Sequence, residues 1–143
     1  MNRRQRRKSA FTLIELVVVM LILAILAAMI VPRIIGRSED AKVARAVSDL
    51  STVRSMLDNF RIDVGRYPST EEGLEALRSA PADASGWRGP YSQKPIGVDP
   101  WGNEYVYEWP GNDGDDSYIL LSFGADGQEG GEGNNEDIIE AGE

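Results

Sequence analysis

The fold of this 143-residue chain is decided by residues 11–31, which read FTLIELVVVMLILAILAAMIV. This stretch contains a single charged side chain, Glu15. As a helix rising about 1.5 Å per residue it would be about 30 Å long, which matches the hydrocarbon core of a bilayer. We therefore predict a membrane-spanning helix over residues 11–31.

Residues 1–10 precede this helix and form a basic leader without any acidic side chain. By the positive-inside rule, such a leader keeps the N-terminal side in the cytoplasm and places the following domain outside. All 23 acidic residues lie in the rest of the chain, whose balance is strongly negative. Because phosphate contacts need clustered lysine and arginine, we expect no nucleic-acid partner.

The same N-terminal features also fit a cleaved secretory signal, with small residues at Ala24, Ala27 and Ala28. The chain would then be a secreted calcium-dependent enzyme or binding module, with a mature N-terminus near Met29. Two observations oppose this: the apolar run exceeds a typical signal core, and Glu15 lies within it. A carboxylate at that depth costs a few kcal/mol and implies a partner, such as an α-amine freed by cleavage before Phe11.

The chain contains no cysteine and no histidine. Disulfides, thiolate and imidazole catalysis, and zinc sites with such ligands are therefore excluded. The remaining carboxylates show no spacing typical of a catalytic pair, so we do not expect an enzyme.

The rest of the chain predicts an α+β domain. Apolar residues at helical spacing predict an amphipathic helix that ends at Gly65, and Pro32 predicts a kink or local break before it. A short helix with a Ser69–Glu72 capping box and a long loop over residues 79–100 should follow. Two alternating runs, 104–109 and 118–123, then predict a β-hairpin. The stripe of the amphipathic helix comprises Val43, Val47, Leu50, Val53, Leu57, Phe60 and Val64.

The N-terminal motif resembles the class III signal of type IV pilins and pseudopilins. It reads Arg7-Lys8-Ser9-Ala10 followed by Phe11-Thr12-Leu13-Ile14-Glu15. The resemblance implies that a prepilin peptidase cuts between Ala10 and Phe11 and methylates the new N-terminus, Phe11. It also implies that Glu15 neutralises the N-terminus of a neighbouring subunit during assembly. Glycine usually precedes the cut, and Ala10 departs from this pattern, but alanine is also small and cleavage is expected.

Further motifs resemble the major pseudopilin of the type II secretion system, the G-type subunit. They read Gly65-Arg66-Tyr67-Pro68, Glu72-Gly73-Leu74-Glu75-Ala76-Leu77, Asp99-Pro100-Trp101-Gly102-Asn103 and Phe123-Gly124-Ala125-Asp126-Gly127. The resemblance implies a type IV pilin-like fold with a cleaved leader (1–10), a transmembrane and filament-core helix (11–31) and a periplasmic domain (32–143). It implies a single-pass inner-membrane protein that polymerises into a periplasmic pseudopilus.

The partners implied by this resemblance are further copies of the chain, minor pseudopilins, the prepilin peptidase, an inner-membrane assembly platform and an outer-membrane secretin. The alternative is a type IV pilus subunit or a minor pseudopilin, which shares the N-terminal motif. Ordinary type IV pilins typically carry a C-terminal disulfide loop, which is impossible here without cysteine.

Residues 124–143 are acidic and glycine-rich, which fits either a solvated tail or a calcium site. Asp126 and Asp137 have the spacing of the first and last ligands of an EF-hand loop, but Gln128 and Gly130 break that motif. The resemblance to major pseudopilins implies that this loop binds Ca²⁺. The implied ligands are the side chains of Asp126 and Asp137, the carbonyls of Phe123 and Gln128, and, as a further candidate, Glu132.

The motif Asp99–Asn103 allows two interpretations. Proline and glycine favour a turn in which Asp99 accepts backbone hydrogen bonds and Trp101 packs beneath the loop. The alternative is a contact between subunits.

Overall fold

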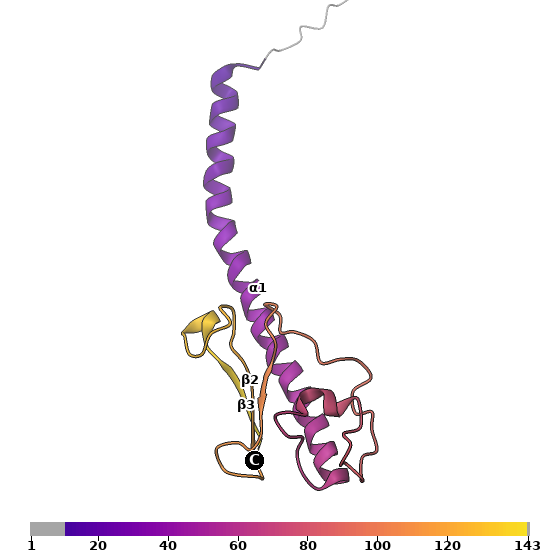
Figure 1. Ribbon diagram of the computed structural model, residues 1–143. Coiled ribbons are helices and arrows are strands. Elements are labelled where there is room, and N and C mark those ends of the chain that lie inside the picture. Colours follow the sequence, from indigo (N-terminus) through magenta and orange to yellow (C-terminus); the bar gives the residue numbers. More distant parts are fainter. Residues whose placement is uncertain (1–10, 143) are drawn as a thin grey trace, which may run out of the picture. The chain divides into compact units, whose positions relative to one another are not determined.

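A computed structural model describes the backbone of residues 11–142 and the side chains of residues 11–28 and 38–140. The leader, including Ala10, lies outside the described residues. The chain divides into two compact units, one ending at Ser38 and one beginning at Glu39. The elements are α1 (Leu13–Val64), the 3₁₀ helix η1 (Gly73–Leu77), β1 (Val106–Glu108), β2 (Tyr118–Ser122), the 3₁₀ helix η2 (Gly133–Asn135) and β3 (Ile138–Gly142) (Figure 1).

Helix α1 ends at the predicted place but does not break at Pro32. It terminates at Val64 because Gly65 has a φ of +88°, a left-handed conformation that glycine adopts without a steric penalty. Helix α1 continues through Pro32, so of the two predicted effects the local break is wrong, whereas the kink stays a prediction. A proline removes one amide donor, and the hydrogen bonds of the neighbouring turns can carry the helix past it.

One face of α1 builds the core of the second unit. Its buried residues are Ala46, Leu50, Val53, Leu57 and Phe60. Val47 was predicted to belong to this stripe, but it is 46% exposed. Ala46 takes the buried position because it lies four residues before Leu50, whereas Val47 is turned by about 100° away from Ala46 around the helix axis.

The segment after α1 is fixed by local hydrogen bonds, as the sequence indicates. The Ser69 amide donates to Glu72 Oε2 (2.7 Å) and the Glu72 amide donates to Ser69 Oγ (3.2 Å), which confirms the capping box. The helix it introduces, η1, is a 3₁₀ helix. Trp87 pins the long loop by donating from Nε1 to the Ala76 carbonyl (3.0 Å).

Within the described residues, the strands form an antiparallel sheet in the order β1-β2-β3. The β1–β2 pair confirms the predicted hairpin, with Val106 opposite Leu121. The alternating pattern of β2 buries Tyr118, Leu120 and Ser122, so Ile119, Leu121 and Phe123 share the outer face. The sequence analysis missed β3, because only its first two residues, Ile138 and Ile139, are large and apolar.

The three-stranded sheet lies alongside the second half of α1 (Figure 1). The buried cluster joins residues of α1 to Leu77 of η1 and to Tyr107 and Leu120 of the sheet. A long helix packed on a small antiparallel sheet confirms the predicted α+β class.

Candidate functional site

The first candidate site is the apolar start of α1. Its large side chains are exposed in every direction around the helix, from 82% at Phe11 to 46% at Val19. A helix that is apolar on all sides needs an apolar environment around it. Across the residues that the structure describes, no helical segment reaches the combined length and hydropathy required to cross a bilayer.

Glu15 lies in the first turn of α1. Its backbone amide donates to Thr12 Oγ1 (3.3 Å), and the Leu16 amide donates to the Thr12 carbonyl (3.3 Å). Thr12 therefore satisfies donors of the first turn that lack a helical partner. The carboxylate itself is exposed among apolar neighbours, in the place where the sequence analysis expects an assembly residue.

The second candidate site is the acidic loop, residues 123–137, which connects β2 to β3 at one end of the sheet (yellow in Figure 1). Asp126 is exposed, and its Oδ1 accepts a hydrogen bond from the Gln128 amide (3.1 Å). Asp137 is half-buried, and its Oδ2 accepts from the Gly130 amide (2.9 Å). The two carboxylates thus accept the amides at the two ends of the backbone from Gln128 to Gly130.

Asp137 Oδ1 is buried and has no hydrogen-bond partner among the described residues. Leaving a buried carboxylate oxygen without a donor or cation costs about 1–3 kcal/mol or more. A cation beside this oxygen would remove the penalty. The residues present therefore fit the calcium ion that the sequence analysis expects.

Glycine allows this loop to close tightly. Gly124 has a φ of +67°, and a Cβ there would lie 2.9 Å from the Glu136 carbonyl oxygen and 3.0 Å from that of Asn134. The Ala125 amide also donates to the Asn134 carbonyl (3.0 Å). The two arms of the loop therefore run against each other, with Asp126 and Asp137 at their ends.

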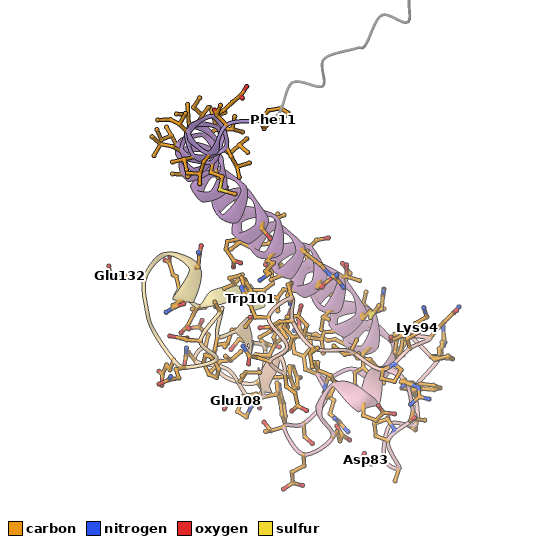
Figure 2. All side chains as sticks on the ribbon, turned by 90° about the horizontal axis from the view of Figure 1, so that it is seen from above. Phe11, Asp83, Lys94, Trp101, Glu108 and Glu132 are labelled. Atoms are coloured by element: carbon orange, nitrogen blue, oxygen red, sulfur yellow. The ribbon has the colours of Figure 1, made fainter. Side chains whose placement is uncertain are left out.

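The remaining predicted ligands lie in the same loop. Phe123 is half-buried where β2 ends, and Gln128 is exposed. Glu132 is exposed at the outer edge of the loop (Figure 2). No group of three or more acidic side chains in the described part of the chain is arranged as a metal cluster. Backbone carbonyls would have to supply much of the coordination.

The Asp99–Asn103 turn adjoins this loop, and its structure agrees with the first of the two interpretations. Asp99 is 3% exposed, and its Oδ1 accepts from the amides of Trp101 (3.0 Å), Gly102 (2.8 Å) and Asn103 (2.8 Å). Trp101 Nε1 donates to Glu39 Oε2 on α1 (3.0 Å). This bond, followed by that from Lys42, lowers the pKa of Glu39 below its usual value.

The sequence analysis did not connect this turn to the acidic loop. Asn103 Nδ2 donates to the Gly124 carbonyl (2.9 Å), and Ser122 Oγ donates to Asp99 Oδ2 (2.6 Å). Ser122 is fully buried. The signal in the sequence was Ser122, a polar residue at a buried position of β2. Because a buried hydroxyl needs a hydrogen-bond partner, Ser122 indicated a polar contact with another segment.

Comparison with known proteins identifies the family of the chain and its N-terminal motif. A sequence model described as "Type II secretion system (T2SS), protein G" matches residues 33–141, and one described as "Prokaryotic N-terminal methylation motif" matches residues 5–31. The Type II secretion system core protein G of Pseudomonas aeruginosa is 44% identical to this chain, and the match covers 94% of this chain and 96% of the relative. Those of Vibrio cholerae and Escherichia coli are 41% and 39% identical, covering 95% and 90% of this chain and 93% and 89% of the relatives.

A crystal structure of the major pseudopilin from the type 2 secretion system of enterohaemorrhagic Escherichia coli has the same fold. It superposes with a TM-score of 0.60 at 35% identity, covering 73% of this chain and 90% of that one. These matches confirm the pilin-like fold and do not favour a type IV pilus subunit or a minor pseudopilin. They indicate a structural family of a secretion system, which is not an enzyme family. The chain belongs to the type II secretion system protein G family.

Proposed function

We propose that this chain is the major structural subunit of a type II secretion pseudopilus. Residues 11–31 would anchor the subunit in the inner membrane, with residues 32–143 in the periplasm, until it joins the fibre. The observation that carries this proposal is an α1 start that is apolar on all sides and holds one carboxylate. The match to the N-terminal methylation motif over residues 5–31 supports it.

The physical basis is a helix that needs neighbours. Burying one large apolar side chain stabilises by about 1.5–3 kcal/mol, so covering this segment is worth on the order of tens of kcal/mol. Lipid supplies this cover before assembly, and the helices of adjacent subunits supply it in the fibre. Cleavage after Ala10 frees an amine on Phe11, which pairs with Glu15 of a neighbouring subunit and removes the cost of a buried carboxylate.

The growing fibre would help drive folded proteins through an outer-membrane secretin. It would work with minor pseudopilins, a prepilin peptidase and an inner-membrane assembly platform. The chain would catalyse no chemical step, and it would act by packing with its copies into the fibre.

The test of this function is Glu15→Ala in the full chain. We expect loss of periplasmic filaments in electron micrographs, with unchanged membrane content and unchanged thermal unfolding of the domain. Asp40→Ala removes an exposed carboxylate elsewhere on α1 and should leave filaments intact. Normal filaments from Glu15→Ala would refute the assembly role of this residue.

Mass spectrometry of the mature N-terminus tests the anchor independently. We expect N-methylated Phe11 as the first residue. A mature chain beginning near Met29 would instead support the secreted enzyme or binding module.

We further propose that the acidic loop binds Ca²⁺ through the side chains of Asp126 and Asp137 and the carbonyls of Phe123 and Gln128. The unpartnered oxygen of Asp137 supports this site, and Glu132, which is exposed in the same loop, is a further candidate ligand. When bound, the ion supplies a double positive charge that offsets the mutual repulsion of the carboxylates.

Thermal unfolding of the full chain in Ca²⁺ and in EGTA tests the metal site. At a free Ca²⁺ concentration of about a hundred times Kd, binding should raise the free energy of unfolding of the domain by about 2.7 kcal/mol. Asp137→Asn should remove this difference, whereas Asp113→Asn, in the exposed β1–β2 turn, should preserve it. Equal unfolding temperatures in both buffers would refute the calcium proposal.

A further inference from the structure

We propose that the Asp99–Asn103 turn positions the acidic loop for calcium and couples that loop to α1. This inference rests on the calcium site proposed above. The turn lies between the two: Figure 2 shows Trp101 beside the helix, on the side where the loop that carries Glu132 lies. The coupling follows from a continuous series of hydrogen bonds.

The series begins on the metal side with the peptide bond between Phe123 and Gly124. The Gly124 amide donates to Ser122 Oγ (3.2 Å), and that hydroxyl donates to Asp99 Oδ2 (2.6 Å). A peptide bond is planar, so fixing the amide of Gly124 also fixes the direction of the Phe123 carbonyl. Asp99 thereby orients a proposed calcium ligand through Ser122.

Asn103 touches the loop on both sides of Asp126. Its Nδ2 donates to the Gly124 carbonyl (2.9 Å), and a Cβ on Gly127 would lie 2.9 Å from its Oδ1. The side-chain amide of Asn103 therefore lies directly against Gly127, and a larger residue there would displace it. This contact holds the backbone before and after the Asp126 ligand.

The series ends on α1. Asp99 Oδ1 accepts three amides of the turn, including that of Trp101, which makes the turn rigid. The Trp101 indole then donates to Glu39 Oε2 (3.0 Å), and Glu39 Oε1 accepts from Lys42 Nζ (2.9 Å). A shift of the loop on metal binding therefore reaches the first turn of the second unit.

Asn103 acts in this scheme as a positioning residue, because it does not bind the metal itself. A hydrogen bond of this type contributes about 1 kcal/mol, so its loss should raise the Kd for Ca²⁺ about fivefold. Coupling of binding sites is reciprocal, so a loop held by calcium must also hold the turn more firmly.

The experiment is a Ca²⁺ titration of the full, ¹⁵N-labelled chain in detergent, followed through the indole N–H signals in NMR spectra. The signal of Trp101 should shift with calcium. Those of Trp87, bonded to the Ala76 carbonyl, and Trp109, bonded to the Asp115 carbonyl, serve as internal controls and should stay fixed.

Asn103→Ala should raise the Kd about fivefold and reduce the shift of the Trp101 signal. Asn112→Ala removes an exposed asparagine of the β1–β2 turn and should change neither value. If Asn103→Ala does not fold, Trp101→Phe replaces it, with the Kd measured by competition with a calcium-sensitive dye. Because phenylalanine cannot donate to Glu39, the Kd should again rise.

The outcomes separate this inference from the calcium proposal. Absence of any calcium binding would overturn both. Binding with a fixed Trp101 signal and an unchanged Kd in Asn103→Ala would overturn the coupling and leave the metal site. A purely structural role for Asn103 would lower the unfolding temperature equally in Ca²⁺ and EGTA, and that result would also overturn the coupling.

Discussion

The two halves of α1 belong to one helix but depend on different surroundings. In the first half, large apolar side chains are exposed all around the helix, at 46–82% from Phe11 to Leu26. In the second half, apolar residues are buried along a single face, with Leu50, Leu57 and Phe60 fully covered. The second half is therefore satisfied within its own subunit, and the first half is not.

This difference shows that assembly and folding are encoded in separate stretches of one helix. A substitution in the first half should change what the subunit joins, and one in the second half should change whether the domain folds. Contacts that tie the second half to η1 and the sheet should have intermediate or small effects. The predictions below test this division from the largest effect to the smallest.

A buried charge should give the largest contrast. Leu50→Lys places an ammonium group in the core, which costs several kcal/mol of a total stability of about 5–15 kcal/mol. We expect this domain to be unfolded by circular dichroism. Val18→Lys should leave the domain folded while abolishing filaments. Early unfolding of the Val18→Lys domain would show that the two halves are energetically linked.

Truncation of leucine sharpens the same contrast without adding charge. Leu57→Ala should cost about 3 kcal/mol because a cavity replaces a fully buried side chain. In a domain of about 100 residues this lowers the unfolding temperature by about 12–24 °C. Leu21→Ala, at a 60% exposed position, should leave that temperature unchanged. Calorimetry of both variants measures these unfolding temperatures, and an equal decrease in the two would contradict the division between the halves of α1.

The Arg66–Glu72 pair, which follows the end of α1, should have an intermediate effect that depends on pH. Arg66 donates to both carboxylate oxygens of Glu72 (2.7 and 2.8 Å) and lowers the pKa of Glu72 to about 2. The lowered pKa stabilises the fold above about pH 4.5, and this contribution is lost as the pH falls toward 2. Glu72→Gln should therefore cost about 2 kcal/mol at pH 7 and almost nothing at pH 2.

Denaturant titrations at both pH values measure this difference. The matched control is Glu71→Gln, which changes the exposed neighbour of Glu72. A loss of stability in Glu72→Gln that is equal at the two pH values would contradict the ionic origin of the effect.

The pair between Arg54 of α1 and Glu140 of β3 should have the smallest effect. Its atoms lie 3.0 Å apart, but the Arg54 side chain is 43% exposed, so water and salt screen the attraction. Glu140→Gln should lower the unfolding temperature by less than Glu72→Gln does, and added salt should remove the difference. Glu108→Gln, on the exposed side of β1, is the control. A drop that persists in high salt would assign Glu140 a role in packing.

The fold could be predicted wherever local chemistry determines it. The end of α1 at Gly65 and the Ser69–Glu72 capping box follow from the preferences of single residues. Val47 was assigned wrongly because the burial of a boundary residue depends on the sheet, which the helix sequence does not contain. Strand β3 was missed because only Ile138 and Ile139 in it are large and apolar, and the residues before it are acidic and glycine-rich.

The residues of the candidate sites could be proposed from the sequence, but their connections could not. Asp126 and Asp137 follow from composition and from the family resemblance. The hydrogen bond from Asn103 to Gly124 joins residues 21 positions apart, and no local pattern predicts it. The unpartnered oxygen of Asp137 depends on the closed loop, so only the structure reveals it.

The place of the acidic loop, between the central strand and the last one, has a consequence for faulty subunits. If the loop stays open, β3 cannot dock, and β2 becomes an edge strand with free amide and carbonyl groups along its length. Such an edge accepts strands from other chains, so a subunit that fails to close its loop is a seed for aggregation. Closure of the loop thus protects the subunit from aggregation through the edge of β2 before it assembles with other copies through α1.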